Sequence, residues 1–472
     1  THMKRPVPLS VVGLLLVMGF TAEMALSGSR SPAQFPGENW THIKASEQHG
    51  WSPEKLRRAE LFAKRIGTAA VMVVAGGKVA AAWGPVDHRF PLHSIRKPLL
   101  SALFGIYVAQ GVLDISRTLE ALGIDDVAPE LTPAEKKATV ADLLTSRSGV
   151  YHPALGEVAA MKQVRPPRAS HPPGTFWYYN NWDFNALGTI FERETGVRIF
   201  EAFEKRIAVP IQMQDFIGRD GTYITGAASV HRVYALRMST RDLARFGLLY
   251  LRKGRWRGRQ ILPPEWVEAS TTTHADIGRG RGYGYMWRTA VGSGLAPNIN
   301  LPVRCCFHSG AGLHFLVVIP RLDLVLVHRV DTYTRGPFPS AQQIGRLFWM
   351  ILDARGVADI GADPSLAGAD AEPLPGDRLV GALTAHRLQI LRPNNLVQGG
   401  DRHYRLDFEA DGSMHLSAKG RENIRGRWHV SENRCCVDID GLQSCFAVVA
   451  TEAAIHFYDS TGTRYATATK VR

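Results

Sequence analysis

Residues 90–105, FPLHSIRKPLLSALFG, place a serine and a lysine three positions apart at the start of an apolar run. The run predicts a buried helix on which Ser94 and Lys97 share one face. Burial lowers the pKa of a lysine, so a neutral Lys97 amine can take the proton of the Ser94 hydroxyl. Pro98 lacks an N–H and disfavours helical geometry at Lys97, which predicts an irregular or 3₁₀ first turn. The start of the helix supplies N–H groups to an oxyanion, and Ser94 is therefore a candidate nucleophile.

A second serine–lysine pair with the same spacing, Ser52 and Lys55, stands in WSPEKLRRAELF at residues 51–62. Its serine is followed by proline and glutamate, the pattern of a helix N-cap with proline at the first helical position. The pair therefore has a complete structural explanation. Because the spacing alone does not identify a nucleophile, the interpretation of Ser94 depends on further motifs.

Two later stretches supply such motifs. Residues 174–196, GTFWYYNNWDFNALGTIFERETG, contain Tyr-x-Asn before a helix, and residues 304–327, RCCFHSGAGLHFLVVIPRLDLVLV, contain His-x-Gly leading into a strand. With the serine–lysine motif, and in this order, they resemble the active-site motifs of the serine β-lactamase-like superfamily. This superfamily includes class C β-lactamases, D-alanyl-D-alanine peptidases, related esterases and 6-aminohexanoate-dimer hydrolases. The resemblance extends over residues 50–355.

The resemblance implies that Ser94 is the acylated nucleophile and Lys97 its base. The second motif fits in two registers, Tyr178 with Asn180 or Tyr179 with Asn181, and the family's spacing to the helix at NALG favours the latter. Tyr179, with a pKa lowered by neighbouring cations, would pass a proton to the leaving group. Asn181 would bind the substrate carbonyl or orient Lys97.

In the third motif, His308 stands where many β-lactamases carry a lysine. The resemblance implies that His308 faces the substrate, that Gly310 allows close substrate approach, and that the N–H groups of Ser94 and Ala311 form the oxyanion hole. Imidazole is a weaker anchor for a carboxylate than a permanent ammonium, which argues against a dedicated β-lactamase. Aromatic residues of the cleft loops are further candidates for substrate contact, above all Tyr151 and Trp182.

The resemblance implies an α/β (α+β) fold, with an antiparallel sheet flanked by helices and a helical subdomain. We assign residues 28–360 to this hydrolase domain and the Pro- and Ala-rich residues 361–376 to a linker. Residues 377–472 show short alternating strands and turns, which predict a small all-β domain, a barrel or a sandwich. Its Asp440-Gly441 turn places Cys436 opposite Cys445 as a non-hydrogen-bonded pair, and we expect a disulfide there.

The N-terminal residues predict export. Residues 1–3, THM, have the pattern of a cloning remnant, and residues 4–27 combine two positive charges, an apolar stretch and small residues, as in a signal peptide. A periplasmic or secreted protein is therefore expected, with an uncleaved membrane anchor as the alternative.

Composition limits the partners of the chain. It has 472 residues, 45% of them hydrophobic and 21% charged, as in a soluble globular protein. The formal net charge is +13, but the basic residues are scattered, so we expect no nucleic-acid partner, whereas contact with a cell wall or membrane surface stays open. No cysteine or histidine spacing indicates a metal, and no cofactor is expected. The oligomeric state is open, with a homodimer as one option.

The expected activity is that of an exported serine hydrolase. It would cleave an amide, in a small or linear peptide or an oligoamide, through an acyl-enzyme on Ser94. Carboxylesterase, D-alanyl-D-alanine peptidase or weak β-lactamase activity on the same site is the first alternative. The second is a catalytically silent peptide-binding protein, and the third a wall- or lipid-binding role for the C-terminal β domain.

Overall fold

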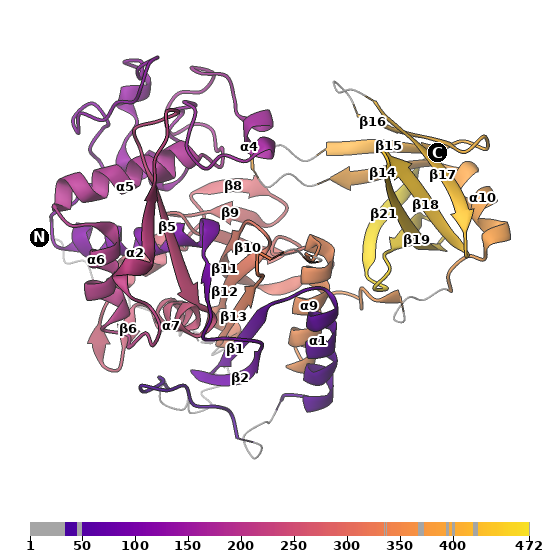
Figure 1. Cartoon of the computed structure of the whole chain (residues 1–472), viewed down its shortest axis with the longest axis horizontal. Coiled ribbons are helices and arrows are strands. Elements are labelled where there is room, and N and C mark those ends of the chain that lie inside the picture. The colour runs from indigo at the N-terminus through magenta and orange to yellow at the C-terminus, as the bar shows by residue number, and fades with distance from the viewer. Residues whose placement is uncertain are drawn as a thin grey trace, which may run out of the picture. The chain divides into compact units, whose positions relative to one another are not determined.

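An antiparallel sheet forms the centre of the hydrolase domain, with its strands in the order β2-β1-β13-β12-β11-β10-β9-β8 (Figure 1). The computed structural model describes residues 34–44, 50–334, 336, 338–366, 372–392, 396–398, 402–418 and 423–471. Within these ranges, the strands of the sheet are β1 Ala70–Ala75, β2 Lys78–Trp83, β8 Ala275–Gly278, β9 Arg281–Tyr283, β10 Arg288–Gly292, β11 Leu301–Gly310, β12 His314–Ile319 and β13 Leu324–Arg329. The interpretations of residues 1–3 and 4–27 fall outside the described residues.

Both faces of this sheet are buried, which explains the continuous apolar runs of its central strands. Side chains alternate between the two faces of a strand. On β1, Met72 and Val74 accordingly belong to one hydrophobic core, and Val71 and Val73 to the other. Helices cover both faces, and the sheet is therefore the middle layer of three.

The helices divide between the two faces. The pair α1 and α9 covers one face, and α7 packs on β1, β12 and β13 from the other, together with α2 and α5 of the helical region (Figure 1). Within the described residues, the α-helices of the hydrolase domain are α1 Pro53–Arg65, α2 Arg96–Ala109, α3 Val140–Leu144, α4 Ala159–Val164, α5 Asn181–Thr195, α6 Ile199–Phe203, α7 Thr240–Leu251, α8 Pro264–Ser270 and α9 Ala341–Ala354. A small sheet in the order β3-β5-β4 lies beside them, with β3 Arg89–Pro91, β4 Gly221–Ile224 and β5 Val233–Ser239.

The C-terminal domain is a closed antiparallel barrel, so the choice between barrel and sandwich is decided. Its strands, in the described ranges, are β14 Arg387–Arg392, β15 Arg402–Phe408, β16 Ser413–Ser417, β17 Ile424–Ser431, β18 Arg434–Ile439, β19 Leu442–Ala450, β20 Ala454–Tyr458 and β21 Arg464–Val471. Helix α10, Gly376–Thr384, precedes the barrel and inserts Leu379 and Leu383 into its core. The expectation of strands from residue 377 onward missed this helix.

The residues interpreted as a linker also contact the barrel. Ser365 forms an antiparallel bridge with Thr463, and Leu366 donates its backbone N–H to Gly462. The hydrolase domain also contacts the barrel through α9, because Arg346 donates to the Thr461 carbonyl at 3.0 Å. These contacts belong to one compact unit that extends from Gln34 onward.

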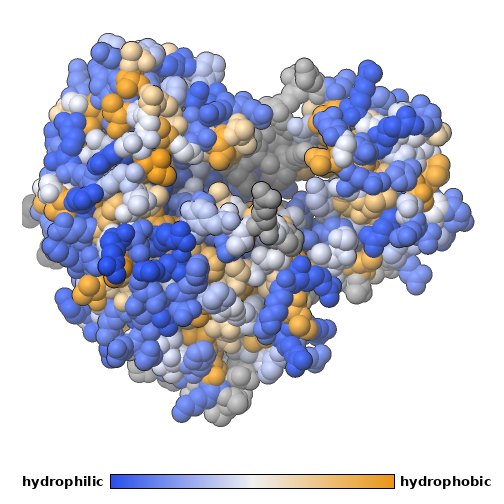
Figure 2. Space-filling view, viewed as in Figure 1, coloured by the Kyte–Doolittle hydropathy of each residue, from blue (hydrophilic) through white to orange (hydrophobic). Residues whose placement is uncertain are grey.

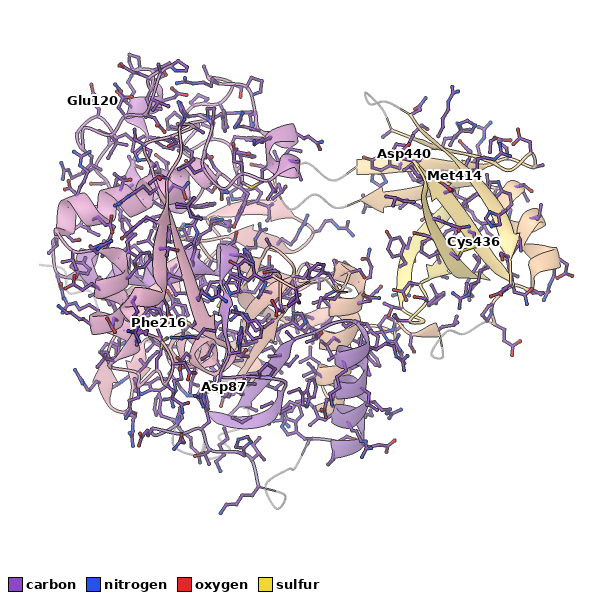
Figure 3. The ribbon with its side chains drawn as sticks, viewed as in Figure 1. Asp87, Glu120, Phe216, Met414, Cys436 and Asp440 are labelled. Carbon is purple, nitrogen blue, oxygen red and sulfur yellow. A yellow bond between two sulfur atoms is a disulfide. The ribbon has the colours of Figure 1, made fainter. Side chains whose placement is uncertain are left out.

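The hairpin of β18 and β19 pairs Cys436 with Cys445, and a disulfide joins the two residues. Asp440 occupies the turn of this hairpin with a φ of +54°, a value that Asp tolerates better than most residues (Figure 3). Cys305, Cys306 and Cys435 are buried free thiols. The two-residue turn therefore sets the register that brings the cysteines of the disulfide together.

The face drawn in Figure 2 is mostly hydrophilic, with apolar residues scattered over it. Exposed large apolar residues are spread over several elements, among them Leu61 on α1 and Leu442 on β19. None of the helices in the described ranges is long and apolar enough to cross a bilayer. The fold class is the expected one: a mixed helix-and-sheet domain followed by a β domain.

Candidate active site

Ser94 lies on a tight turn between β3 and α2. A 3₁₀ turn, His93–Ile95, precedes α2, as the position of Pro98 predicts. Pro98 falls in the first turn of α2, where backbone N–H groups have no intrahelical partner in any case. His93 has a φ of +48°, a left-handed value that is strained for a residue other than glycine. The strained turn presents Ser94 at the wall of a cavity.

Lys97 connects the first two motifs. Its Nζ lies within hydrogen-bond distance of Ser94 Oγ at 3.1 Å, of the Tyr179 hydroxyl at 2.6 Å and of Asn181 Oδ1 at 3.0 Å. The side chain is buried, and its amine also lies over the rings of Tyr179 and Phe184, at 4.2 and 4.3 Å from their centroids. A lysine within hydrogen-bond distance of a serine hydroxyl is the arrangement that a Ser–Lys nucleophile requires.

Burial lowers the pKa of Lys97 well below its usual value. The positive charges of Arg96 and Arg288 lower the pKa further. Its three hydrogen-bond partners, Ser94, Tyr179 and Asn181, carry no carboxylate to oppose this lowering, so the site favours the neutral amine more than an exposed lysine would. A neutral amine is the form that accepts a proton.

The structure distinguishes the two registers of the second motif. Tyr179 and Asn181 contact Lys97, whereas the Tyr178 hydroxyl donates to the Met161 carbonyl at 3.1 Å. Asn180 caps α5: its side chain accepts from the Trp182 N–H at 3.1 Å. Asn181 also donates to the Gly156 carbonyl at 2.7 Å, which fixes its oxygen toward Lys97.

The pKa of Tyr179 is raised, contrary to the lowered value expected from the sequence. Burial is the largest cause, and it outweighs the opposing effects of Arg288, Ser94 and Arg96. The hydroxyl is therefore protonated in the resting site. It can donate a proton to a leaving group without first having to gain one.

The third motif approaches the Ser94 turn through a glycine. A Cβ on Gly310 would lie 2.8 Å from the Leu92 carbonyl oxygen and 3.2 Å from His93 Cβ. The glycine therefore allows β11 to pack closely against the Ser94 turn. The sequence predicted a different reason for it, the close approach of substrate. Ser94, Gly310 and Ala311 all line the cavity.

His308 lies behind this wall and is not among the cavity-lining residues in the described part of the chain. Its ring is 6.2 Å from that of Tyr179, between centroids, and its Nδ1 lies 3.0 Å from the Ser309 carbonyl. Burial lowers its pKa well below the usual value, and the positive charges of Arg288 and of Lys97 in its protonated form lower it further. A neutral His308 therefore lies beside Tyr179, and its side chain is set back from the cavity wall, so its expected contact with substrate stays a prediction.

Tyr151 and Trp182 are also absent from the cavity wall in the described ranges. Trp182 is fully buried, and its indole N–H donates to Asp126 Oδ2 at 2.7 Å. The Tyr151 hydroxyl lies 3.0 Å from Nδ1 of His171. Both aromatic residues support the helical region instead, because their polar atoms find partners there.

Two arginines near the site were missed by the sequence argument. Arg288 on β10 lies over the Tyr179 ring, with its guanidinium carbon 4.8 Å from the centroid. Arg96 lies over Tyr234 at 4.1 Å and donates to Asn185 Oδ1 at 3.1 Å. Both line the cavity and are buried. The available signal for Arg288 was its place at the end of the aromatic run GYGYMWR, residues 282–288.

The second serine–lysine pair, Ser52 and Lys55, has the structural role that its pattern predicts. Ser52 caps α1 and accepts from the Lys55 backbone N–H at 3.3 Å. The Lys55 amine pairs with Asp353 on α9 at 2.8 Å. The Lys55 side chain is 41% exposed and its amine is salt-bridged, so it lacks the buried setting of Lys97.

The cavity beside Ser94 has a volume of about 1170 Å³. Its lining combines Lys97, Tyr179 and Asn181 with apolar residues of the hydrolase domain and of the barrel, among them Met161, Leu313, Ile390, Leu391 and Leu396. In the described ranges, no group of His, Cys, Asp and Glu side chains is arranged to hold a metal ion.

Comparison with known proteins gives a family and a fold. The family model described as Beta-lactamase matches residues 48–337, more than half of the chain, whereas no curated protein matches. Among solved structures, the octameric penicillin-binding protein homologue from Pyrococcus abyssi is similar at 17% identity and a TM-score of 0.51, over 88% of this chain and 98% of that one.

Two further structures are similar at a TM-score of 0.48. One is described as a 6-aminohexanoate-dimer hydrolase from Bacillus anthracis, at 20% identity over 62% of this chain and 80% of that chain. The other is SurE, at 19% identity over 89% and 98%. At these identities the similarities concern the fold alone. The family match is independent of them, and by it the chain belongs to the Beta-lactamase family, with the fold of the β-lactamase-like serine hydrolases.

Proposed function

We propose that the protein is a serine hydrolase that cleaves an amide bond, in a small or linear peptide or in a linear oligoamide, through an acyl-enzyme on Ser94. The observation that carries the proposal is the 3.1 Å contact between Lys97 Nζ and Ser94 Oγ, formed by a buried amine whose pKa is lowered. A catalytically silent binding pocket has no need of a lysine poised in this way.

The proposed reaction follows from the protonation states. Ser94 Oγ attacks the carbonyl carbon while its proton passes to the neutral Lys97 amine, and the Ser94 and Ala311 N–H groups stabilise the oxyanion. Tyr179 gives its proton to the departing amine and regains one from the Lys97 ammonium across their 2.6 Å contact. The C–N bond breaks, and the acyl group stays on Ser94. A water then attacks the ester while its proton passes to the Lys97 amine, the bond to Ser94 Oγ breaks, and Lys97 returns the proton to Ser94 as the acid leaves.

The size of the cavity supports an extended substrate. Its volume of about 1170 Å³ exceeds that of most pockets for one small molecule, and apolar residues form much of its wall. A peptide or oligoamide chain presents successive amide groups and apolar segments to such a wall. Esters use the same chemistry with a better leaving group, so carboxylesterase activity is the first alternative outcome.

Covalent labelling tests the proposal. A fluorophosphonate probe should form an adduct on Ser94, mapped by mass spectrometry, and Ser94→Ala should abolish it. Ser52→Ala is the matched control, because Ser52 has the same spacing to a lysine but caps a helix. If Ser94 of the wild-type protein stays unlabelled, the proposed enzyme activity is rejected. The alternative, a catalytically silent peptide-binding protein, is then favoured.

The same probe distinguishes the substrates. Benzylpenicillin that blocks the label would indicate wall peptides or β-lactams, as for a D-alanyl-D-alanine peptidase. Turnover of short amides and p-nitrophenyl esters, compared by kcat/KM, decides between an amidase and a carboxylesterase.

The proposal includes export of the protein. This part of the proposal rests on the sequence pattern of residues 4–27. Expression of the full chain in a Gram-negative host, followed by fractionation and N-terminal sequencing, tests it. A periplasmic protein that begins near residue 28 would support cleavage. A full-length product in the membrane fraction would support the anchor, and a full-length product in the cytoplasm would reject export.

A further inference from the structure

A segment of the C-terminal barrel pairs with the residues that lead to the catalytic tyrosine. The Tyr179 N–H donates to the Leu396 carbonyl at 2.8 Å, and the Gln398 N–H donates to the Trp177 carbonyl at 3.2 Å. Between them, Tyr178 and Val397 form an antiparallel bridge. The Trp177 N–H donates in return to the side-chain oxygen of Gln398 at 3.3 Å. Residues 396–398, between β14 and β15, therefore act as a short strand beside residues 177–179.

The Leu396 side chain belongs to the hydrolase domain although its residue belongs to the barrel sequence. It packs against the core that contains Leu99, Trp177 and Tyr179, and it lines the cavity beside Ser94. The barrel has its own core, which includes Leu388 and Leu406 of the flanking strands. Leu396 thus anchors the barrel sequence in the hydrolase core beside the active site.

The opposite edge of residues 177–179 is held by the hydrolase domain. Ser146 accepts from the Tyr178 N–H at 3.2 Å, and its hydroxyl donates to the Tyr178 carbonyl at 2.6 Å. These bonds fix Tyr178, whereas the backbone N–H of Tyr179 has Leu396 as its acceptor. Tyr179 is almost fully buried, so without this acceptor its N–H would lose a partner that water does not readily replace.

We propose that residues 396–398 are a positioning element of the active site, through which the barrel holds Tyr179 within hydrogen-bond distance of Lys97. The inference rests on the proposed function, because it concerns the tyrosine that protonates the leaving group. Leu396 and Gln398 act through Tyr179 and are positioning residues. The barrel is accordingly part of the catalytic unit rather than an independent binding module.

Variants of the full-length protein test the proposal. Leu396→Ala removes the docking side chain, Gln398→Ala removes the acceptor of the Trp177 N–H, and Leu396→Met retains an apolar side chain of similar size. Leu442→Ala is the matched control, because Leu442 lies on the barrel strand β19 and is 79% exposed. The readouts are the rate of fluorophosphonate labelling at Ser94 across pH, kcat and KM for a short amide substrate, whose leaving amine needs a proton, and the thermal midpoint.

We expect Leu396→Ala to lower the labelling rate and kcat on the order of 10- to 100-fold, as for a catalytic group displaced by about 1 Å, with KM little changed. Gln398→Ala should act in the same direction with a smaller effect, and Leu396→Met should restore most of the rate. Loosening of Tyr179 exposes Lys97 to water and raises its pKa, so the acidic limb of the pH profile should move to higher pH. A merely structural role would leave this limb in place.

The results separate this inference from the proposed function. An unlabelled wild-type protein rejects the proposed function, and the positioning role falls with it. A labelled wild type with wild-type rates and pH profiles in both Leu396→Ala and Gln398→Ala rejects the positioning role alone. If Leu396→Ala fails to fold, Gln398→Ala decides: a slower rate with a shifted acidic limb supports the proposal, and an unchanged profile overturns it.

Discussion

Lys97 Nζ lies 2.6 Å from the Tyr179 hydroxyl, and both groups are buried from solvent. The pKa of the lysine is lowered and that of the tyrosine is raised, so burial favours the neutral form of each. A neutral amine and a protonated phenol form a base and an acid in direct contact.

Removing the Lys97 amine should abolish most of the acylation. In Lys97→Met the rate of fluorophosphonate labelling at Ser94 should fall by about 10²–10⁴-fold, the usual contribution of a general base. Lys55→Met is the matched control, because it removes the lysine of the other serine–lysine pair and only a half-exposed salt bridge. Equal labelling of Lys97→Met and wild type would exclude Lys97 as the base.

The acylation rate should rise with pH through the pKa of Lys97 in the folded protein, because only the neutral amine accepts a proton. Arg288 lowers this pKa by charge repulsion. In Arg288→Met the pKa of Lys97 should therefore rise, and the acidic limb of the labelling profile should move to higher pH. The measurement is the labelling rate between pH 5 and about 10, the range in which a lowered lysine pKa titrates. A limb that stays in place would show that Arg288 does not act on Lys97.

The two adjacent tyrosines should differ in their effects. Tyr179→Phe keeps the ring over Lys97 and removes only the hydroxyl, and it should lower kcat for an amide substrate by about 10²–10⁴-fold. Tyr178→Phe removes the bond to the Met161 carbonyl and should cost about 1 kcal/mol of unfolding free energy, with kcat nearly unchanged. Steady-state kinetics and urea unfolding of both variants check the assignment, which the reverse pattern would overturn.

Gly310 should be intolerant of a side chain. In Gly310→Ala the new Cβ would lie 2.8 Å from the Leu92 carbonyl oxygen, so the Ser94 turn or β11 must shift. We expect a loss of labelling on the order of 10²-fold, as for a misplaced nucleophile. Gly381→Ala in α10 is the control, because a Cβ there meets open space and the change should raise stability by about 0.5–1 kcal/mol. Full labelling of Gly310→Ala would show that the turn adapts.

The cysteines should react according to the barrel register. Of the five cysteines, Cys436 and Cys445 are joined and the remaining three are free. Alkylation of the denatured protein without reductant should modify Cys305, Cys306 and Cys435, and reductant should release the other two. Mass spectrometry of the peptides is the measurement, and a modified Cys436 before reduction would contradict the disulfide.

Much of the fold followed from local patterns. Proline after Ser52 predicts a capped helix, and Pro98 predicts the 3₁₀ turn at Ser94, because each proline acts on its own turn. A two-residue turn sets a hairpin register, so the Cys436–Cys445 pair could be derived by counting from Asp440-Gly441. Helix α10 was missed because only Leu379 and Leu383 mark its buried face, too few residues to reveal a helical period.

The sequence by itself determined the order of the three motifs, and the family match agrees with the resemblance they carry. Only the tertiary structure decided which side chains surround the site. Arg288 and Leu396 reach Tyr179 from positions more than 100 residues away, and no local pattern records such contacts. Trp182 follows Asn181 directly, yet it faces Asp126 and the core. Neighbours on a helix point in different directions, and long-range packing decides which of them reaches the cavity.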